Sequence, residues 1–284
     1  MTVKPPWYER IQNINKPAIY LVLVAVTFLP LVRPLGLPLT LSPNTRAAFK
    51  VVDSLPAGAI VWHSIGFNPA VDAETWPQML ALTRHYMSKH LKIIYFPTMQ
   101  EGGMYADRIK TTYAAECGYE YGKDYAVLPF KAGGETAIAG LKDFGSMFSR
   151  DAYGTPIGSL PIFQGFSGMK DVAVIVPTTG GEDVIHYVRY IEPVYKMPVL
   201  ACGTATLLPV VGPFISSGQV KGAVIGLSGA AEYEALAKVP GTATAAMDAQ
   251  AMGHVLIVAL VLIGNVGLFF QRRARRNQEV ANDG

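Results

Sequence analysis

The stretch VAVIVPTTGGEDVIHYVRYIEPVY, residues 172–195, shows how the central part of this chain is built. A run of mostly β-branched residues at 172–176 is followed by a proline, two threonines and a glycine pair. A helical pattern then extends from 183 to 195. A short apolar run, a glycine-containing connection and a helical period together predict a strand, a turn and a helix in succession.

The same order of elements recurs along most of the chain. The expected strands are 57–65, 91–96, 125–130, 172–176, 199–201 and 222–227, and the expected helices are 74–89, 104–117, 136–148, 183–195 and 207–216. Strands that alternate with helices of this length indicate βαβ units. We therefore predict an α/β fold of the doubly wound type, with a mostly parallel sheet and helices on both faces.

Two stretches of this domain depart from the alternation. Residues 152–170 are rich in glycine and proline, and they predict a long loop that acts as a lid or an interaction surface. The stretch GLSGAAEYEAL at 226–236 predicts a turn that enters a helix. We expect Glu232, Tyr233 and Glu234 of that helix to face solvent or a neighbouring chain.

The strongest membrane signal lies near the C-terminus. Residues 252–270 are nineteen residues without a formal charge, and as a helix they would extend about 28 Å, close to the hydrocarbon thickness of a bilayer. Four arginines follow within residues 271–276. By the positive-inside rule, they predict that this end of a transmembrane helix is cytoplasmic.

A shorter apolar run, residues 17–32, follows a basic flank near the N-terminus. A secretory signal peptide is the rival interpretation. We favour an uncleaved signal anchor, because prolines and Arg33 follow the run where a cleavage site would need small residues. Two such spans predict a membrane protein with both termini cytoplasmic and the intervening domain extracytoplasmic, either periplasmic or extracellular.

The sequence therefore divides into six segments. These are a cytoplasmic flank at 1–16, a signal anchor with an interfacial segment at 17–41, an extracytoplasmic α/β domain at 42–237, a tether at 238–251, a transmembrane helix at 252–270 and a cytoplasmic basic tail at 271–284. The Ala-rich part of the tether is expected to prolong the last helix. Asn265 is the strongly polar residue inside that helix, and it suggests pairing with the first span or with another copy, although a solitary Asn is tolerated.

Composition excludes several classes of function. The net charge is +3, but residues 41–246 hold 16 Lys and Arg against 17 Asp and Glu, so the central domain is nearly neutral. Without a basic stripe, nucleic-acid binding is not expected. Cys117 and Cys202 lack partners at metal-ligand spacing, so no metal site is expected. A disulfide between them is discounted, because the fold places them at opposite edges.

A repeated junction is the pattern most informative about function. The chain reads PTMQEGG at 97–103, PFKAGGE at 129–135 and PTTGGED at 177–183, each time between a strand and a helix. Ligands of open parallel sheets bind at this edge, and glycine pairs expose backbone N–H groups that hold anions. The predicted site for a small polar or anionic ligand consists of Thr98, Lys131, Gly133, Gly134, Thr178, Thr179, Gly180 and Gly181.

Turn chemistry alone also explains these junctions. A strand-to-helix turn needs permissive residues whatever its function, and Glu135, Glu182 and Asp183 place negative charge at the starts of helices. Acidic residues there would repel an anion. None of the three junctions is a Walker A loop or a G-x-G-x-x-G fingerprint, and we expect no cofactor.

Catalysis has less support. His63 is expected at a strand end that faces the candidate edge, and Cys202 is expected at another strand end. A hydrolase that uses these two residues and a junction acid is conceivable. It ranks last, because no nucleophile motif accompanies them.

Two functions therefore lead. The first is a membrane-anchored scaffold that self-associates or docks a membrane protein partner, with the loop 153–169 as its surface. The residues expected at such contacts are Tyr153, Phe163, Phe166 and Asn265. The second is an extracytoplasmic ligand-binding or sensory module that uses the junctions.

Overall fold

The structure is a computed structural model that describes residues 6–239 and 241–282. The chain divides into two compact units, one formed by Pro38–Thr244 and the other by Met1–Leu37 with Ala245–Gly284. Each unit is described by itself. The first five residues of the predicted flank, Pro240 of the tether and the last two residues of the basic tail lie outside the described residues.

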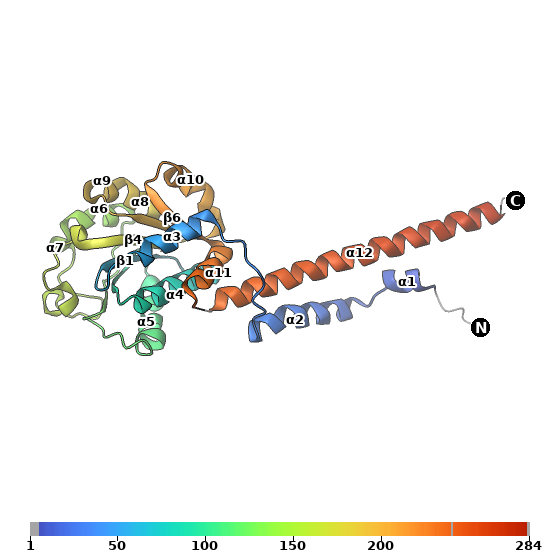
Figure 1. Ribbon diagram of the computed structural model, residues 1–284, viewed down its shortest axis with the longest axis horizontal. Coiled ribbons are helices and arrows are strands. Elements are labelled where there is room, and N and C mark those ends of the chain that lie inside the picture. The colour runs from blue at the N-terminus through green and yellow to red at the C-terminus, as the bar shows by residue number, and fades with distance from the viewer. Residues whose placement is uncertain (1–5, 240, 283–284) are drawn as a thin grey trace. The chain divides into compact units, whose positions relative to one another are not determined.

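The described residues of Pro38–Thr244 form a six-stranded sheet with the order β3-β2-β1-β4-β5-β6 (Figure 1). Every pairing in it is parallel, which confirms the predicted α/β class and makes the sheet wholly rather than mostly parallel. The strands are β1 (Ile60–Gly66), β2 (Lys92–Pro97), β3 (Tyr125–Val127), β4 (Val172–Thr179), β5 (Val199–Gly203) and β6 (Val220–Ile225).

Helices cover both faces of the sheet, because successive strand residues point to opposite sides and both sides are apolar. One core contains Trp62 of β1 and the side chains of α6, α7, α8 and α10, and the other contains Val61 and the side chains of α3, α4, α5 and α11. The bounds are α3 (Pro43–Asp53), α4 (Asp72–Ser88), α5 (Gly102–Ile109), α6 (Glu135–Gly140), α7 (Phe144–Met147), α8 (Asp183–Tyr190), α9 (Glu192–Tyr195), α10 (Leu208–Ser216) and α11 (Gly226–Ala237).

Each predicted strand and helix is present, but three helices are interrupted. The helix expected at 104–117 continues from α5 as a π-helical turn, Lys110–Ala114. The helix expected at 136–148 is split into α6, a 3₁₀ turn and α7. The helix expected at 183–195 is divided into α8 and α9, because Pro193 has no N–H to donate to the carbonyl one turn earlier.

The segment 152–170 is packed against the sheet. It contains three short 3₁₀ turns, and Ile162, Phe163 and Met169 belong to the same core as Trp62. The carboxylate of Asp151 fixes its start by accepting hydrogen bonds from the Tyr121 hydroxyl at 2.6 Å and the Thr155 N–H at 2.7 Å. The described form of this loop is therefore a folded part of the domain.

Helix α11 corrects the expectation for its acidic residues. Tyr233 is fully buried, and Glu232 and Glu234 are 8% and 2% exposed, so they do not face solvent. Glu232 accepts a hydrogen bond from the N–H of Ser42, the N-cap of α3, at 2.9 Å. Glu234 accepts from the N–H groups of Ala243 and Thr244 at 3.0 and 2.8 Å. Each carboxylate satisfies backbone N–H groups that a helix start leaves without partners.

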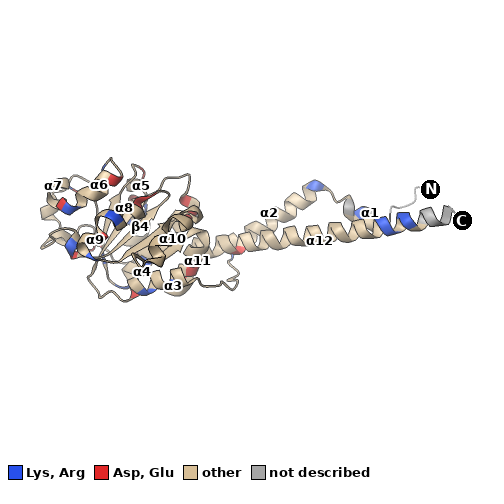
Figure 2. Cartoon of the chain, turned by 90° about the horizontal axis from the view of Figure 1, so that it is seen from above, with Lys and Arg blue, Asp and Glu red and all other residues tan. Residues whose placement is uncertain are grey.

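The second unit contains α1 (Trp7–Gln12), α2 (Lys16–Val32) and most of α12 (Thr242–Asn282). Among the described residues, α12 is the one helix that is long and apolar enough to cross a membrane, over Thr242–Asn277. Figure 2 shows the arginines of this helix gathered near its C-terminal end. The Ala-rich part of the tether, residues 242–251, is helical and belongs to α12, as predicted. Helix α2 has 17 residues and is shorter than such a span requires, so a second span is not shown.

One buried carboxylate fixes the end of the α2 segment to α12. Asp248 is 3% exposed and accepts hydrogen bonds from the N–H groups of Leu35, Gly36 and Leu37 at 2.7, 2.9 and 3.1 Å. Gly36 has a φ of +65°, which lets the three N–H groups converge on one anion. Both segments of this unit are therefore joined by a specific polar contact.

Candidate ligand-binding crevice

The strand order reverses direction between β1 and β4. Helix α4 follows β1 on one face of the sheet, whereas α8 follows β4 on the other. Two neighbouring strands whose connections leave in opposite directions keep a gap open beyond their C-terminal ends, and ligands of this fold class bind there. The structure therefore places its candidate site beyond Gly66 and Thr179.

Two adjacent cavities occupy this edge. The first has a volume of about 210 Å³ and is lined by Gly66, Asn68, Val71, Met99, Thr179, Gly180, Gly181 and Asp183. The second, of about 290 Å³, begins at the same glycine pair and is lined also by Glu182, Thr204, Thr206, Leu207 and Val210. We call the two cavities together the switch-point crevice.

A half-buried carboxylate forms the inner wall of the first cavity. The Thr98 hydroxyl donates a hydrogen bond to Oδ2 of Asp183 at 2.5 Å. Burial raises the pKa of Asp183, and hydrogen bonding to Thr98 opposes this shift. Gly66 is required beside it, because a Cβ at this position would lie 2.0 Å from the same carboxylate oxygen.

The glycine pair does not offer free N–H groups for an anion. The N–H of Gly180 donates to the carbonyl of Gly66 at 3.0 Å, and the N–H of Gly181 donates to the Thr179 hydroxyl at 2.9 Å. The Thr179 hydroxyl in turn donates to the same carbonyl of Gly66 at 3.0 Å. These bonds close the β4 turn onto β1. At this junction both N–H groups therefore stabilise the turn and are not available to an anion.

Four of the eight predicted ligand-binding residues meet at the crevice: Thr98, Thr179, Gly180 and Gly181. Thr178 points into the core, where its hydroxyl lies 3.1 Å from Nε2 of His63. The other three, Lys131, Gly133 and Gly134, follow β3 at the edge of the sheet, with β2 and β1 between this strand and β4. The first and third junctions therefore meet at the crevice, whereas the junction after β3 lies apart from it.

Sequence reasoning missed Gly66 and gave Asp183 only the role of a charge at a helix start. A glycine at the end of a central strand was the available signal, because close approach of another segment is one reason for such a glycine. The turn after β1, IGFNPAVD at 65–72, has a single glycine and so lacks the fingerprint with which doubly wound folds hold dinucleotides.

His63 and Cys202 are interior residues. His63 is the fourth of seven residues in β1 and is fully buried, which corrects its expected place at a strand end. Burial lowers the pKa of His63 to about 3 and raises the pKa of the Cys202 thiol to about 12. Neither residue lines the crevice. A hydrolase built on this pair would lack both an accessible base and a reactive thiolate.

The remaining predicted contact residues differ in exposure. Phe163 is 6% exposed, and Phe166 packs against it and against Phe144 with ring centroids 5.5 and 5.0 Å away. Tyr153 is 43% exposed, with its hydroxyl bonded to Asp107. Asn265 is exposed on α12. Tyr153 and Asn265 are thus the two exposed residues of the four, whereas Phe166 is partly buried and Phe163 is buried.

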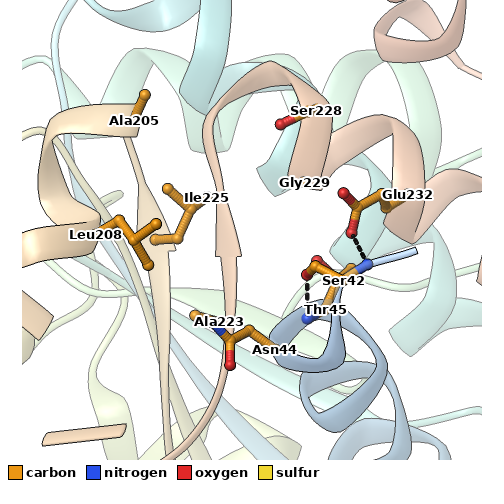
Figure 3. A pocket seen from close by; sticks show the side chains of 10 residues that line it. All are labelled: Ser42, Asn44, Thr45, Ala205, Leu208, Ala223, Ile225, Ser228, Gly229 and Glu232. Carbon is orange, nitrogen blue, oxygen red and sulfur yellow. Dashed lines mark hydrogen bonds between the residues drawn. The ribbon is translucent and has the colours of Figure 1, made fainter. Parts of the chain in front are cut away.

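A third cavity, of about 230 Å³, lies where α3, α10, β6 and α11 meet (Figure 3). Figure 3 shows Leu208 and Ile225 on one side of it and Ser228 and Glu232 on the other. Its polar groups mainly cap α3, because the N–H of Thr45 donates to the Ser42 hydroxyl at 3.1 Å while Glu232 holds the N–H of Ser42. Helix capping therefore accounts for this cavity without a ligand.

Comparison with known proteins found no family model that matches the chain, and no similar curated protein or solved structure. Arguments about function therefore depend on the geometry described above.

Proposed function

We propose that this chain is a membrane-anchored module whose α/β domain binds a small polar ligand in the switch-point crevice. The observation that carries the proposal is the reversal of strand order between β1 and β4, with Gly66 kept free of a side chain beside the carboxylate of Asp183. General experience with open parallel sheets supports a binding role for this edge. The fold alone assigns no chemistry.

The lining favours a ligand that donates hydrogen bonds. Its charged side chains in the described residues are the carboxylates of Asp183 and Glu182, and threonine hydroxyls supply most other polar groups. A carboxylate accepts hydrogen bonds from hydroxyl and amino groups and repels anions. The proposed ligand therefore carries hydroxyl or amino groups, in contrast to the anion that free glycine N–H groups would hold.

Membrane anchoring is the second part of the proposal. Apolar side chains along both α2 and α12 are exposed, among them Leu21 at 72% and Leu262 at 61%. Exposure of such surfaces to water costs free energy, whereas in a bilayer lipid covers them. We propose that both helices cross the bilayer, that the arginines after Phe270 mark the cytoplasmic side, and that the α/β domain is extracytoplasmic.

Ligand-dependent thermal stability tests the binding role. The purified full chain is screened against polyols, sugars and amines, with carboxylates and phosphates as the anionic arm. We expect a neutral or cationic ligand to raise the melting temperature of the wild type but not of Asp183→Asn. Lys131→Ala is the matched control, because Lys131 belongs to the junction after β3 and its loss should leave the shift unchanged.

Three outcomes would contradict the proposal. Absence of any shift across the panel removes the binding role. If only anions raise the melting temperature, and Lys131→Ala abolishes this effect, the binding site is instead the junction after β3. A shift that persists in Asp183→Asn would place the ligand outside the crevice.

Self-association is a second candidate function, and Asn265 favours it. Its side chain is exposed within the uncharged stretch 252–270 of α12 and makes no hydrogen bond within the described residues. An amide in hydrocarbon gains about 1 kcal/mol from a partner on another helix. We expect the mass of the particle in nanodiscs to exceed one chain, and Asn265→Leu to reduce it. A wild-type particle that is strictly monomeric would exclude this role.

A further inference from the structure

Residues 197–220 contain no charged residue, and α10 lies within this stretch. The inner side of α10 packs on the sheet through Val211, which is fully buried. Its outer side is apolar as well, since Leu208 is 43% and Val210 is 41% exposed, and Pro209 and Pro213 are exposed beside them. A surface helix ordinarily turns polar residues outward. We call the exposed surface of these four residues the α10 face. Because it is apolar, its contact with water is unfavourable.

The position of α10 within the domain indicates what covers this face. Leu208 lines the same 230 Å³ cavity as Ser42, the residue at which the chain enters α3 from its N-terminal segment. Helix α11 holds this connection through Glu232 and holds the connection to α12 through Glu234. Both chain connections of the domain thus converge on one helix, and the α10 face begins at the cavity beside it.

Covalent geometry then limits the distance to the apolar segments. Five residues, 38–42, connect Leu37 to α3, and even fully extended they span at most about 17 Å. If α2 and α12 are in a bilayer, as proposed above, the start of α3 cannot move far from the lipid surface. The domain is then always held close to the lipid surface, which can cover an apolar face.

We propose that the α10 face inserts into the interfacial layer of the bilayer that anchors the chain. This inference rests on the membrane anchoring in the proposed function and not on the ligand. The helix has nine residues, about 14 Å in length, so it lies at the interface and does not cross the hydrocarbon. With no basic residue in 197–220, insertion depends on apolar burial, and neither salt nor anionic lipid is expected to change it.

Site-specific fluorescence in vesicles tests the insertion. The full chain carries Cys117→Ser, which removes the exposed thiol and leaves the fully buried Cys202 unlabelled. An environment-sensitive dye is attached at Val210→Cys, and separately at Val194→Cys on α9 and Val258→Cys on α12. The two controls are exposed apolar positions, at 56% and 58%. The vesicles are phosphatidylcholine, with or without nitroxide-labelled phosphatidylcholine.

We expect blue-shifted emission that nitroxide lipid quenches at positions 210 and 258, and water-like, unquenched emission at 194. Quenching at 258 without quenching at 210 overturns the inference while the anchoring stands. Loss of quenching at 258 overturns the anchoring itself. Val210 also lines the second cavity of the switch-point crevice. A blue shift at 210 that nitroxide lipid leaves unquenched therefore also overturns the inference, because protein, either the wall of this crevice or a second copy of the chain, then surrounds the dye in place of lipid.

A charged substitution provides an independent check in the same vesicles. Leu208→Glu places a carboxylate on the α10 face, and the exposed position of Leu208 makes loss of the fold unexpected. With the dye at position 210, we expect quenching to fall towards the value at 194, whereas Leu208→Ile should retain it. Equal quenching in the two variants would contradict insertion.

Discussion

The junctions PTTGGED, 177–183, and PFKAGGE, 129–135, have similar sequences and different surroundings. The first lies at the centre of the sheet, where Asp183 is half-buried against Thr98 and Gly66. The second lies at the edge, where Glu135 is 42% exposed and pairs with Arg189 at 3.0 Å. We call them the central and the outer junction. Their difference teaches that strand order, rather than the junction motif, creates a crevice.

Glycines play different parts in the two junctions. In the central junction Gly66 provides space, since a Cβ would meet oxygens of Asp183, Thr98 and Thr179 within 2.9 Å. In the outer junction Gly134 provides a backbone conformation, with a φ of +48° and no atom within 4 Å of an added Cβ. One residue type therefore answers two separate physical needs, packing and backbone geometry.

The largest expected effect is that of Gly66→Ala. Overpacking against three oxygens should lower the free energy of unfolding by about 3 kcal/mol, measured by denaturant titration of the full chain. Gly134→Ala should cost about 1–2 kcal/mol through backbone strain alone. Gly181→Ala is the control within the central junction, because its added Cβ meets only the Thr179 hydroxyl, at 3.8 Å.

A double-mutant cycle separates space from strain. Asp183→Ala removes the nearest atom that the added Cβ would meet, so its effect should be strongly non-additive with Gly66→Ala. The same partner should be additive with Gly134→Ala, because that glycine contacts nothing at the central junction. Additivity of both pairs would refute the packing role of Gly66.

A smaller effect is expected from the hydrogen-bond donors of the two carboxylates. Thr98→Val keeps the shape of the side chain but leaves a half-buried carboxylate without its donor, which should cost about 2 kcal/mol. At the outer junction, Arg189→Ala breaks a solvent-exposed ion pair, whose loss should be hard to measure. Equilibrium unfolding of both variants at one pH provides the test. Equal losses would mean that the two carboxylates have similar surroundings after all.

Most of the fold follows from the local sequence. Strand-forming runs such as 172–176 and the helical periods between them give the element order and the α/β class, because each element is bounded by its own turn. Helix α3 was missed, since it is short and mixed in charge and directly follows a long apolar segment. Its N-cap, Ser42, is local, but the N–H of Ser42 is held by Glu232, which lies 190 residues away along the chain.

The site was only partly predictable for the same reason. Thr179, Gly180 and Gly181 were found because they belong to one local turn, whereas the contact of Gly66 with Asp183 depends on β1 and β4 being neighbours. No local sequence pattern predicts the order of strands in the sheet. The acidic residues of α11 were misplaced likewise, because their partners are N–H groups of segments outside that helix.

The smallest effect is a difference in pH dependence between the two junctions. Burial raises the pKa of Asp183 above its ordinary value of 3.8, so the folded state binds this proton more tightly than the unfolded chain. Stability should fall as the pH rises from 3.8 through the pKa of the folded state. Hydrogen bonds from Tyr190 and Arg189 lower the pKa of Glu135 below 4.5, so its contribution is present above pH 4.5 and is lost as the pH falls.

The two contributions have opposite signs, which makes the comparison measurable in one experiment. Denaturant unfolding of the wild type, Asp183→Asn and Glu135→Gln is followed from about pH 3.5 to 5.5, a range that includes the ordinary pKa values of both carboxyl groups. Relative to the wild type, Asp183→Asn should gain stability as the pH rises and Glu135→Gln should lose it. If both differences had the same sign, the half-buried carboxylate at the central junction would titrate like a surface group, and the crevice would lose the chemical feature that distinguishes it from an ordinary turn.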